Sequence, residues 1–192
     1  MSTSKITFRL ENMKFELPSD SLRKTEWGGA PLHIPYIYLR AKHVASIVKQ
    51  FVQSKYPNVV VASTSQVYSG GDSVDVYVSD ERGNPIEDSI VKDINRFARS
   101  FQEGNFNGMI DMYEYNDTDL VSDNGTKISG GAKYVFVNNR PKFGSVADVV
   151  RMLNDYQAGK YVGGVRDLAG SIKAIMGYGI TQATVDKALK LI

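Results

Sequence analysis

The stretch that decides the fold is residues 69–80, which read SGGDSVDVYVSD. Val74, Val76 and Val78 alternate with polar or aromatic residues, which is the period-two pattern of a strand with one buried face. The Gly-Gly pair before them is typical of a hairpin turn, because glycine adopts the backbone angles that tight turns require. Further β-type segments at 59–62 and 66–68 precede the turn, so we expect an antiparallel sheet here.

Two segments on either side of this β region have the periodicity of amphipathic helices. The first covers residues 41–56, and the second covers 86–102. We expect the apolar positions of both helices to face the sheet. These positions are Val44, Ile47, Val48, Phe51 and Val52 in the first helix, and Ile90, Ile94, Phe97 and Phe101 in the second.

The remaining β material is expected in shorter pieces. Residues 5–10 and 14–17 alternate as a hairpin, and a Gly- and Pro-rich loop follows at 25–35. Short strands are predicted at 36–39 and 109–115. A second Ser-Gly-Gly stretch, Ser129-Gly130-Gly131, lies between 127–128 and 134–137, and we interpret it as another hairpin.

The C-terminal part differs in composition, with helical segments at 146–156, 165–176 and 181–191 separated by glycines. The sequence therefore predicts an α+β fold, with a mainly antiparallel sheet, two packed helices and a C-terminal helical subdomain. The expected domain organisation is an N-terminal hairpin and loop extension (1–35), a central α+β domain (36–142) and the helical subdomain (143–192).

Composition limits the classes of function. The 192 residues contain no cysteine, which excludes disulfides, thiolate nucleophiles and cysteine-containing zinc sites. The formal net charge of +2 argues against bulk electrostatic coating of nucleic acid, although it permits a local basic patch. No signal peptide or membrane-length apolar run is present. We therefore expect a soluble, cytoplasmic protein that uses no cofactor and contacts no membrane.

The centre of the chain carries two distinctive sequence motifs. Residues 68–73 (YSGGDS) lead into the alternating strand that ends at Asp80, and residues 101–111 read FQEGNFNGMID, followed by the 113–115 tail. With a helix that ends near Tyr56, these motifs resemble the large polyvalent protein-associated domains of bacteriophages and mobile elements over residues 41–137. The resemblance implies a phage or mobile-element origin, without a particular activity.

Within the second motif we predict a structural role for the aromatic, glycine and acidic positions Phe101, Gly104, Phe106, Gly108 and Asp111. The Asp111 carboxylate is expected to accept hydrogen bonds from the turn at 104–108. The chain departs from the family pattern at residues 82–85 (RGNP), which form an insertion, and at Asn107, where an aspartate is common.

No constellation of residues predicts catalysis or a metal site. Ser69 as a nucleophile needs a base, and the two histidines, His33 and His43, are expected in surface or capping roles. The acidic run around Asp117 lacks the glycine and distal glutamate of a calcium loop. An enzyme built on Asp111 or Asp72 is the least favoured alternative.

The candidate binding residues fall into two groups. The hairpin turn formed by Tyr68, Ser69, Gly70, Gly71 and Asp72 could present backbone N–H groups to an anion, although a purely structural turn is favoured. Tyr77, Arg140 and Lys142 form the second group. If the loop carrying the two cations lies beside Tyr68 or Tyr77, aromatic platforms next to cations would suit single-stranded nucleic acid.

These observations favour a non-enzymatic, phage-encoded binding protein that inhibits or redirects a host component, in counter-defence or host takeover. A host protein is the expected partner. A nucleic-acid-binding accessory protein is the alternative, and the oligomeric state is left open.

Overall fold

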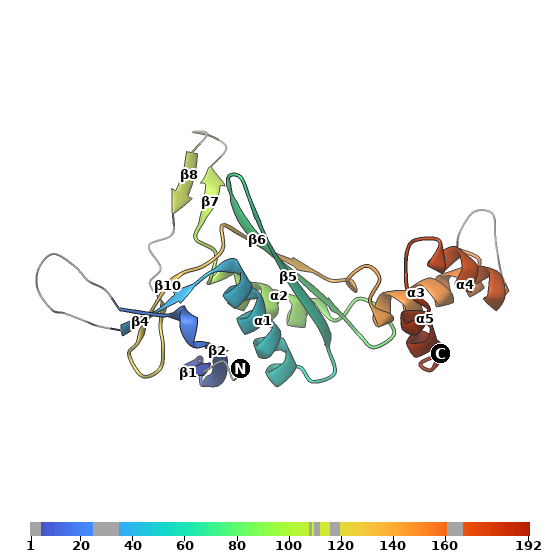
Figure 1. Cartoon of the computed structure of the whole chain (residues 1–192), viewed down its shortest axis with the longest axis horizontal. Helices are drawn as coiled ribbons and strands as arrows, with labels where there is room; N and C mark the ends of the chain where they lie inside the picture. The colour runs from blue at the N-terminus through green and yellow to red at the C-terminus, as the bar shows by residue number, and fades with distance from the viewer. Residues whose placement is uncertain (1–4, 25–34, 108, 110–111, 116–119, 161–166) are drawn as a thin grey trace, which may run out of the picture.

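The computed structural model describes residues 5–24, 35–107, 109, 112–115, 120–160 and 167–192. In these residues, sheets and two helices form the body of the molecule, and three further helices form its C-terminal end (Figure 1). The predicted α+β class is confirmed, and most strand pairs are antiparallel. In the described part of the chain, no helix has the length and apolar character needed to span a membrane.

A three-stranded sheet in the order β11-β6-β5 lies at the centre of the body. β5 (Val60–Tyr68) and β6 (Gly71–Ser79) form an antiparallel hairpin with Tyr68 opposite Gly71, which confirms the predicted turn. β11 (Tyr134–Asn138) lies parallel to β6 along its other edge. The two predicted segments at 59–62 and 66–68 are one continuous strand, because every residue of β5 pairs with β6.

Both helices of the body pack on the same face of this sheet. α1 (Ala41–Lys55) covers β5 and β6, while α2 (Asp88–Arg99) covers β11 and contacts α1. Val74, Val76 and Val78 of β6 are fully buried beneath them, as is the predicted apolar stripe of α1. The period-two and helical patterns therefore predicted the buried faces of the strands and helices correctly. Apolar side chains are removed from water where these elements pack together.

A stack of phenylalanines connects the N-terminal hairpin to the same core. β1 (Lys5–Leu10) and β2 (Met13–Pro18) pair antiparallel, as predicted, and a 3₁₀ turn (Ser19–Ser21) follows. The ring of Phe15 in β2 lies 5.8 Å from that of Phe97 in α2, and the ring of Phe97 stacks 3.9 Å from that of Phe51 in α1. The hairpin thus shares one core with the central body.

Ion pairs reinforce this attachment at the surface. The Arg96 guanidinium in α2 donates to both carboxylate oxygens of Glu11, at 2.7 and 3.0 Å, and contacts Asp93 at 3.2 Å. Lys55 and the Tyr56 hydroxyl donate to the second oxygen of Asp93, at 2.8 and 2.7 Å. The hydrogen bond from Arg96 lowers the pKa of Glu11. Burial raises the pKa of Asp93, but the hydrogen bonds from Lys55, Tyr56 and Arg96 outweigh it and leave this pKa lowered.

Arg96→Gln is therefore expected to make the protein less stable at neutral pH and less sensitive to acid. Because Glu11 and Asp93 have lower pKa values folded than unfolded, their stabilisation is present above the unfolded values of 4.5 and 3.8. It is lost as the pH falls through the folded values. These side chains are partly exposed, so we expect a loss of less than about 1 kcal/mol at pH 7. Urea unfolding at pH 7, 5, 4 and 3 measures it.

In this experiment the gap between wild type and Arg96→Gln should narrow as the pH falls toward 3. Lys49→Gln is the matched control, because Lys49 also lies on a helix of the body but makes no ion pair among the described residues. A gap that stays constant from pH 7 to pH 3 would show that the carboxylates do not stabilise the fold through Arg96.

A second, four-stranded sheet has the order β3-β4-β10-β9. β4 (Pro35–Leu39) contains the strand predicted at 36–39. It pairs antiparallel with β3 (Leu22–Lys24) and parallel with β10 (Lys127–Gly130). β9 (Leu120–Val121) lies on the outer side of β10.

The hairpin predicted around Ser129-Gly130-Gly131 is wrong, because β10 and β11 belong to different sheets. The chain crosses between the sheets beside the end of α2, where Ala132 exchanges backbone hydrogen bonds with Phe101 and Glu103. A Cβ at Gly131 would lie 2.2 Å from the Phe101 carbonyl oxygen. Glycine is thus needed here for close passage of two backbones, not for a turn.

The second family motif also differs from its predicted form. Phe101 is buried against Phe97, with ring centroids 5.3 Å apart, as a structural role requires. However, the predicted turn at 104–108 is mostly strand β7 (Gly104–Asn107), which includes Phe106 and pairs antiparallel with β8 (Met112–Tyr115). Pairing to β8 supplies backbone hydrogen bonds that an isolated glycine-rich stretch lacks. Gly108 and Asp111 lie outside the described residues, as does most of the 25–35 loop with His33.

The C-terminal helices are α3 (Val146–Gln157), α4 (Leu168–Met176) and α5 (Gln182–Leu189), close to the predicted segments. They surround a small core of their own, which includes Leu153 and Ile175. A hydroxyl or carboxylate caps each N-terminus, with Ser145 accepting from the Asp148 N–H in α3.

Candidate nucleic-acid interface

The face of the central sheet opposite the helices carries aromatic side chains. Cross-strand partners in a sheet point to the same face, so the register places Tyr77 of β6 with Tyr68 of β5 and with Tyr134 and Phe136 of β11. Phe136 is 50% exposed and Tyr68 is 46% exposed, while Tyr77 and Tyr134 are half-buried. We call this surface the open face.

Cations lie over two of these rings. The Arg140 guanidinium carbon is 6.0 Å from the centroid of the Tyr77 ring, and the Lys133 ammonium is 5.6 Å from that of Tyr134. The Tyr134 and Phe136 rings stack with centroids 6.2 Å apart. Arg140 and its neighbour Lys142 are exposed, and neither forms an ion pair with a carboxylate in the described part of the chain. No carboxylate among the described residues therefore neutralises the charges of Arg140 and Lys142.

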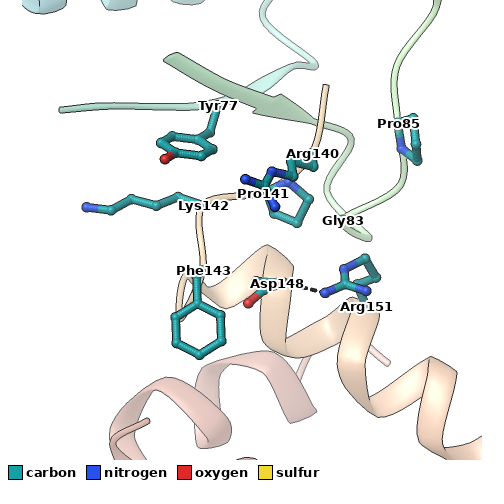
Figure 2. Close-up of a pocket in the computed structure, with 9 residues that line it drawn as sticks. All are labelled: Tyr77, Gly83, Pro85, Arg140, Pro141, Lys142, Phe143, Asp148 and Arg151. Carbon is teal, nitrogen blue, oxygen red and sulfur yellow. Dashed lines mark hydrogen bonds and ion pairs between the residues drawn. The ribbon is translucent and has the colours of Figure 1, made fainter. Parts of the chain in front are cut away.

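A cleft of about 540 Å³ lies at the Tyr77 end of the open face (Figure 2). Tyr77 and Arg140 line one side, whereas Asp148 and Arg151 of α3 line the other, with Lys142 and Phe143 on the connecting loop. Phe143 is 64% exposed and contacts Tyr178 edge-on, 6.4 Å between centroids. The cleft is therefore the junction between the body and the C-terminal helices.

On the α3 side of the cleft, the buried carboxylate of Asp148 pairs with the partly exposed Arg151. The Asp148 carboxylate accepts from Arg151 at 2.8 Å and from the Gly144 N–H at 3.0 Å, and its side chain is only 4% exposed. Arg151 also donates to Asp155 at 3.0 Å. Because two carboxylates contact Arg151, the excess positive charge in the cleft comes from Arg140 and Lys142.

Gly83 of the 80–84 loop is one of the residues that line the cleft. Asp80 accepts from the N–H groups of Arg82 and Asn84, which holds the loop in a tight turn. Gly83, with φ of +79°, approaches α3 so closely that a Cβ there would lie 2.2 Å from the Ala147 carbonyl oxygen. Gly83, which lies in the predicted insertion at 82–85, thus contacts the helical subdomain.

The hairpin turn at the other end of the sheet has structural partners. Asp72 accepts from the Lys133 N–H at 2.7 Å, and the Lys133 ammonium donates to the Gly70 carbonyl at 2.7 Å. These contacts attach the turn to the start of β11. Ser69 and Gly71 belong to the same turn, which favours the structural interpretation of the group.

A second cavity, of about 400 Å³, lies on the helix side of the hairpin tip. Arg40, Lys42, Asp72 and Glu103 are among its lining residues, so its charges are mixed. Burial and the neighbouring charge of Asp72 raise the pKa of Glu103.

Neither this cavity nor the cleft contains a nucleophile paired with a base among the described residues. No group of acids and histidines in those residues has metal-ligand geometry.

His43 is buried, so a surface role is wrong, while its capping role is confirmed. Its Nδ1 accepts from the Arg40 N–H at the start of α1, at 3.2 Å. Burial lowers the pKa of this imidazole.

The structure brings Tyr77 together with Arg140 and Lys142 in one cleft, which satisfies the condition set from the sequence. Tyr68 shares the open face but lies at the hairpin tip, at the far end of β6 from Tyr77. Sequence reasoning missed Tyr134, Phe136, Lys133 and Phe143. For Tyr134 and Phe136, the signal in the sequence was their alternation with Val135 and Val137. Because Val135 and Val137 face inward, the two aromatic side chains must point outward.

Fold and site together define an α+β protein with an open aromatic sheet face flanked by cations. The chain belongs to the large polyvalent protein associated domain 29 family, whose model matches residues 39–144, more than half of its length. The predicted resemblance is confirmed. The match contains the central sheet and the loop with Arg140 and Lys142, while the N-terminal hairpin and α3 to α5 lie outside it. No curated protein and no solved structure matches the chain.

Proposed function

We propose that this protein binds single-stranded nucleic acid along the open face, with bases stacked on the exposed aromatic rings and phosphates near Arg140 and Lys142. The observation that carries the proposal is the Arg140 guanidinium 6.0 Å above the Tyr77 ring, on the same face as Phe136 and Tyr134. Aromatic platforms beside a basic groove are the common solution for binding single strands with little sequence preference.

The geometry favours a single strand over a duplex. The stacking of a base on a ring requires an unpaired base, whose face is accessible. Tyr134 and Phe136 are two residues apart on β11. Their Cα atoms therefore lie about 7 Å apart along the strand, because each residue rises about 3.3 Å. With a net charge of only +2, affinity depends on stacking and a few local cations.

We extend the proposal to the biological setting, a bacteriophage or mobile-element protein acting in the cytoplasm of the host cell, which the family match supports. The expected host-protein partner, and inhibition or redirection of a host component, remain predictions. They rest on the family context rather than on a feature of the open face. The test below distinguishes a nucleic-acid partner from a host-protein partner.

The test is binding of labelled single-stranded DNA and RNA of about 20 nucleotides, followed by fluorescence anisotropy across a salt series. Phe136→Leu is expected to weaken binding by about 5- to 150-fold, because one base–aromatic stack contributes about 1–3 kcal/mol. Arg140→Ala should weaken binding and reduce the slope of log K against log salt by roughly one, because it removes one phosphate contact.

Lys49→Ala is the matched control, since this exposed cation of α1 lies on the helix side of the sheet. It should leave affinity and salt slope nearly unchanged. If neither DNA nor RNA binds at 50 mM salt, the proposal fails. A host protein retained after nuclease treatment, and lost with Phe136→Leu, would then make the open face a protein-binding surface.

A further inference from the structure

We infer that the cleft between Tyr77 and α3 binds a terminal phosphate of the nucleic-acid strand, so that the protein prefers strands with a phosphorylated end. The inference rests on the proposed function, since the open face is taken to bind the strand that leads into the cleft. The ligand chemistry is a phosphate monoester on a terminal nucleotide.

The shape of the cleft favours the end of a strand over its middle. Its walls are the edge of the open face and α3, and the 80–84 loop meets α3 at Gly83, within contact distance of the Ala147 carbonyl (Figure 2). A strand that follows the open face past Phe136 and Tyr77 therefore reaches a wall. An interior nucleotide has chain on both sides and needs an exit, whereas a terminal nucleotide does not.

The size of the cleft suits one nucleotide. The volume of about 540 Å³ lies within the range of small-ligand sites, about 300–1,000 Å³. Tyr77 and Phe143 supply aromatic surface on two sides of the cleft. A single nucleotide with one stacked base matches this combination of volume and lining.

The charge of the cleft matches that of a phosphate monoester. Arg151 is neutralised by Asp148 and Asp155, but Arg140 and Lys142 have no carboxylate partner among the described residues. Two uncompensated cations match a phosphate monoester, which carries a charge of about −1.5 to −2 at pH 7 because its second pKa is near 6. An internal phosphodiester carries a charge of only −1. The cleft should therefore distinguish an end from the middle of a strand.

The experiment compares four oligonucleotides of one sequence: a 5′-phosphorylated strand, a 3′-phosphorylated strand, a strand with hydroxyls at both ends, and a covalently closed circle. We expect one phosphorylated strand to bind about 10-fold tighter than the hydroxyl strand, and the circle to bind no better than the hydroxyl strand. The preference should decrease below pH 6, as the monoester takes up its second proton.

Variants separate the inference from the proposed function. Lys142→Ala is expected to remove most of the preference for the phosphorylated end, since it removes one of the two free cations. Phe136→Leu should weaken all four ligands by the same factor and leave the ratio between them intact. Lys142→Arg should retain the preference, because the charge is kept.

The outcomes are distinct. Equal affinity for all four oligonucleotides would overturn the terminal-phosphate inference and leave the proposed function standing. The same conclusion follows if Lys142→Ala weakens every ligand equally. Failure of all four to bind at low salt would overturn the proposed function itself.

Discussion

Phe97→Ala is expected to lower the free energy of unfolding by about 3–5 kcal/mol, the range for truncation of a buried phenylalanine. The ring is fully buried and lies at the centre of an aromatic stack, 3.9 Å from Phe51 and 5.8 Å from Phe15. Truncation leaves a cavity where α1, α2 and the N-terminal hairpin meet. Urea unfolding followed by circular dichroism measures the change.

The control for Phe97→Ala is Phe136→Ala, in which the same side chain is removed from the open face. Because Phe136 is half exposed and lies on the sheet face opposite α1 and α2, its truncation should change stability far less than that of Phe97. The variant Phe51→Ala should be strongly non-additive with Phe97→Ala, since the two rings are in direct contact. A loss below about 1 kcal/mol for Phe97→Ala would show that the aromatic stack is not central to the core.

Gly83→Ala is expected to destabilise the protein by about 2–4 kcal/mol or to release the C-terminal helices from the body. A φ of +79° at a non-glycine residue costs about 1–3 kcal/mol, and the new Cβ would also lie 2.2 Å from the Ala147 carbonyl oxygen. That oxygen belongs to the backbone of α3, which cannot rotate away as a side chain can. Either the 80–84 loop or the helix must shift.

Hydrogen exchange distinguishes these two results, because release of the helices raises exchange along the α3 side of the junction before the body core is affected. Gly125→Ala is the matched control. Gly125 has nearly the same φ, +82°, but a Cβ there would meet no atom within 4 Å. The difference in the free energy of unfolding between Gly83→Ala and Gly125→Ala therefore isolates the contribution of packing against α3. Equal effects of both substitutions would show that backbone strain alone is responsible and that the junction is not tightly packed.

The candidate site was only partly predictable from the sequence. Tyr77, Arg140 and Lys142 were selected by residue type, and their proximity was stated as a condition, because no local pattern relates β6 to a loop more than 60 residues later. Tyr134 and Phe136 were missed for another reason. Their strand was placed in a hairpin with residues 127–128, so its true neighbour, β6, and the open face they share were not considered.

The sequence by itself determined the helices, most strands and their inner faces, because burial imposes a local period of 3.6 or 2 residues on the apolar side chains. It also determined the family, through motifs within residues 39–144. The tertiary structure alone decided the partners of β10 and β11 and which of the candidate residues lie together in one site. The same tripeptide, Ser-Gly-Gly, forms a hairpin at 69–71 and a crossing between two sheets at 129–131. Glycine permits both backbone paths, so the choice is made by what lies beside it: β5 in the first case, and the Phe101 carbonyl at the end of α2 in the second.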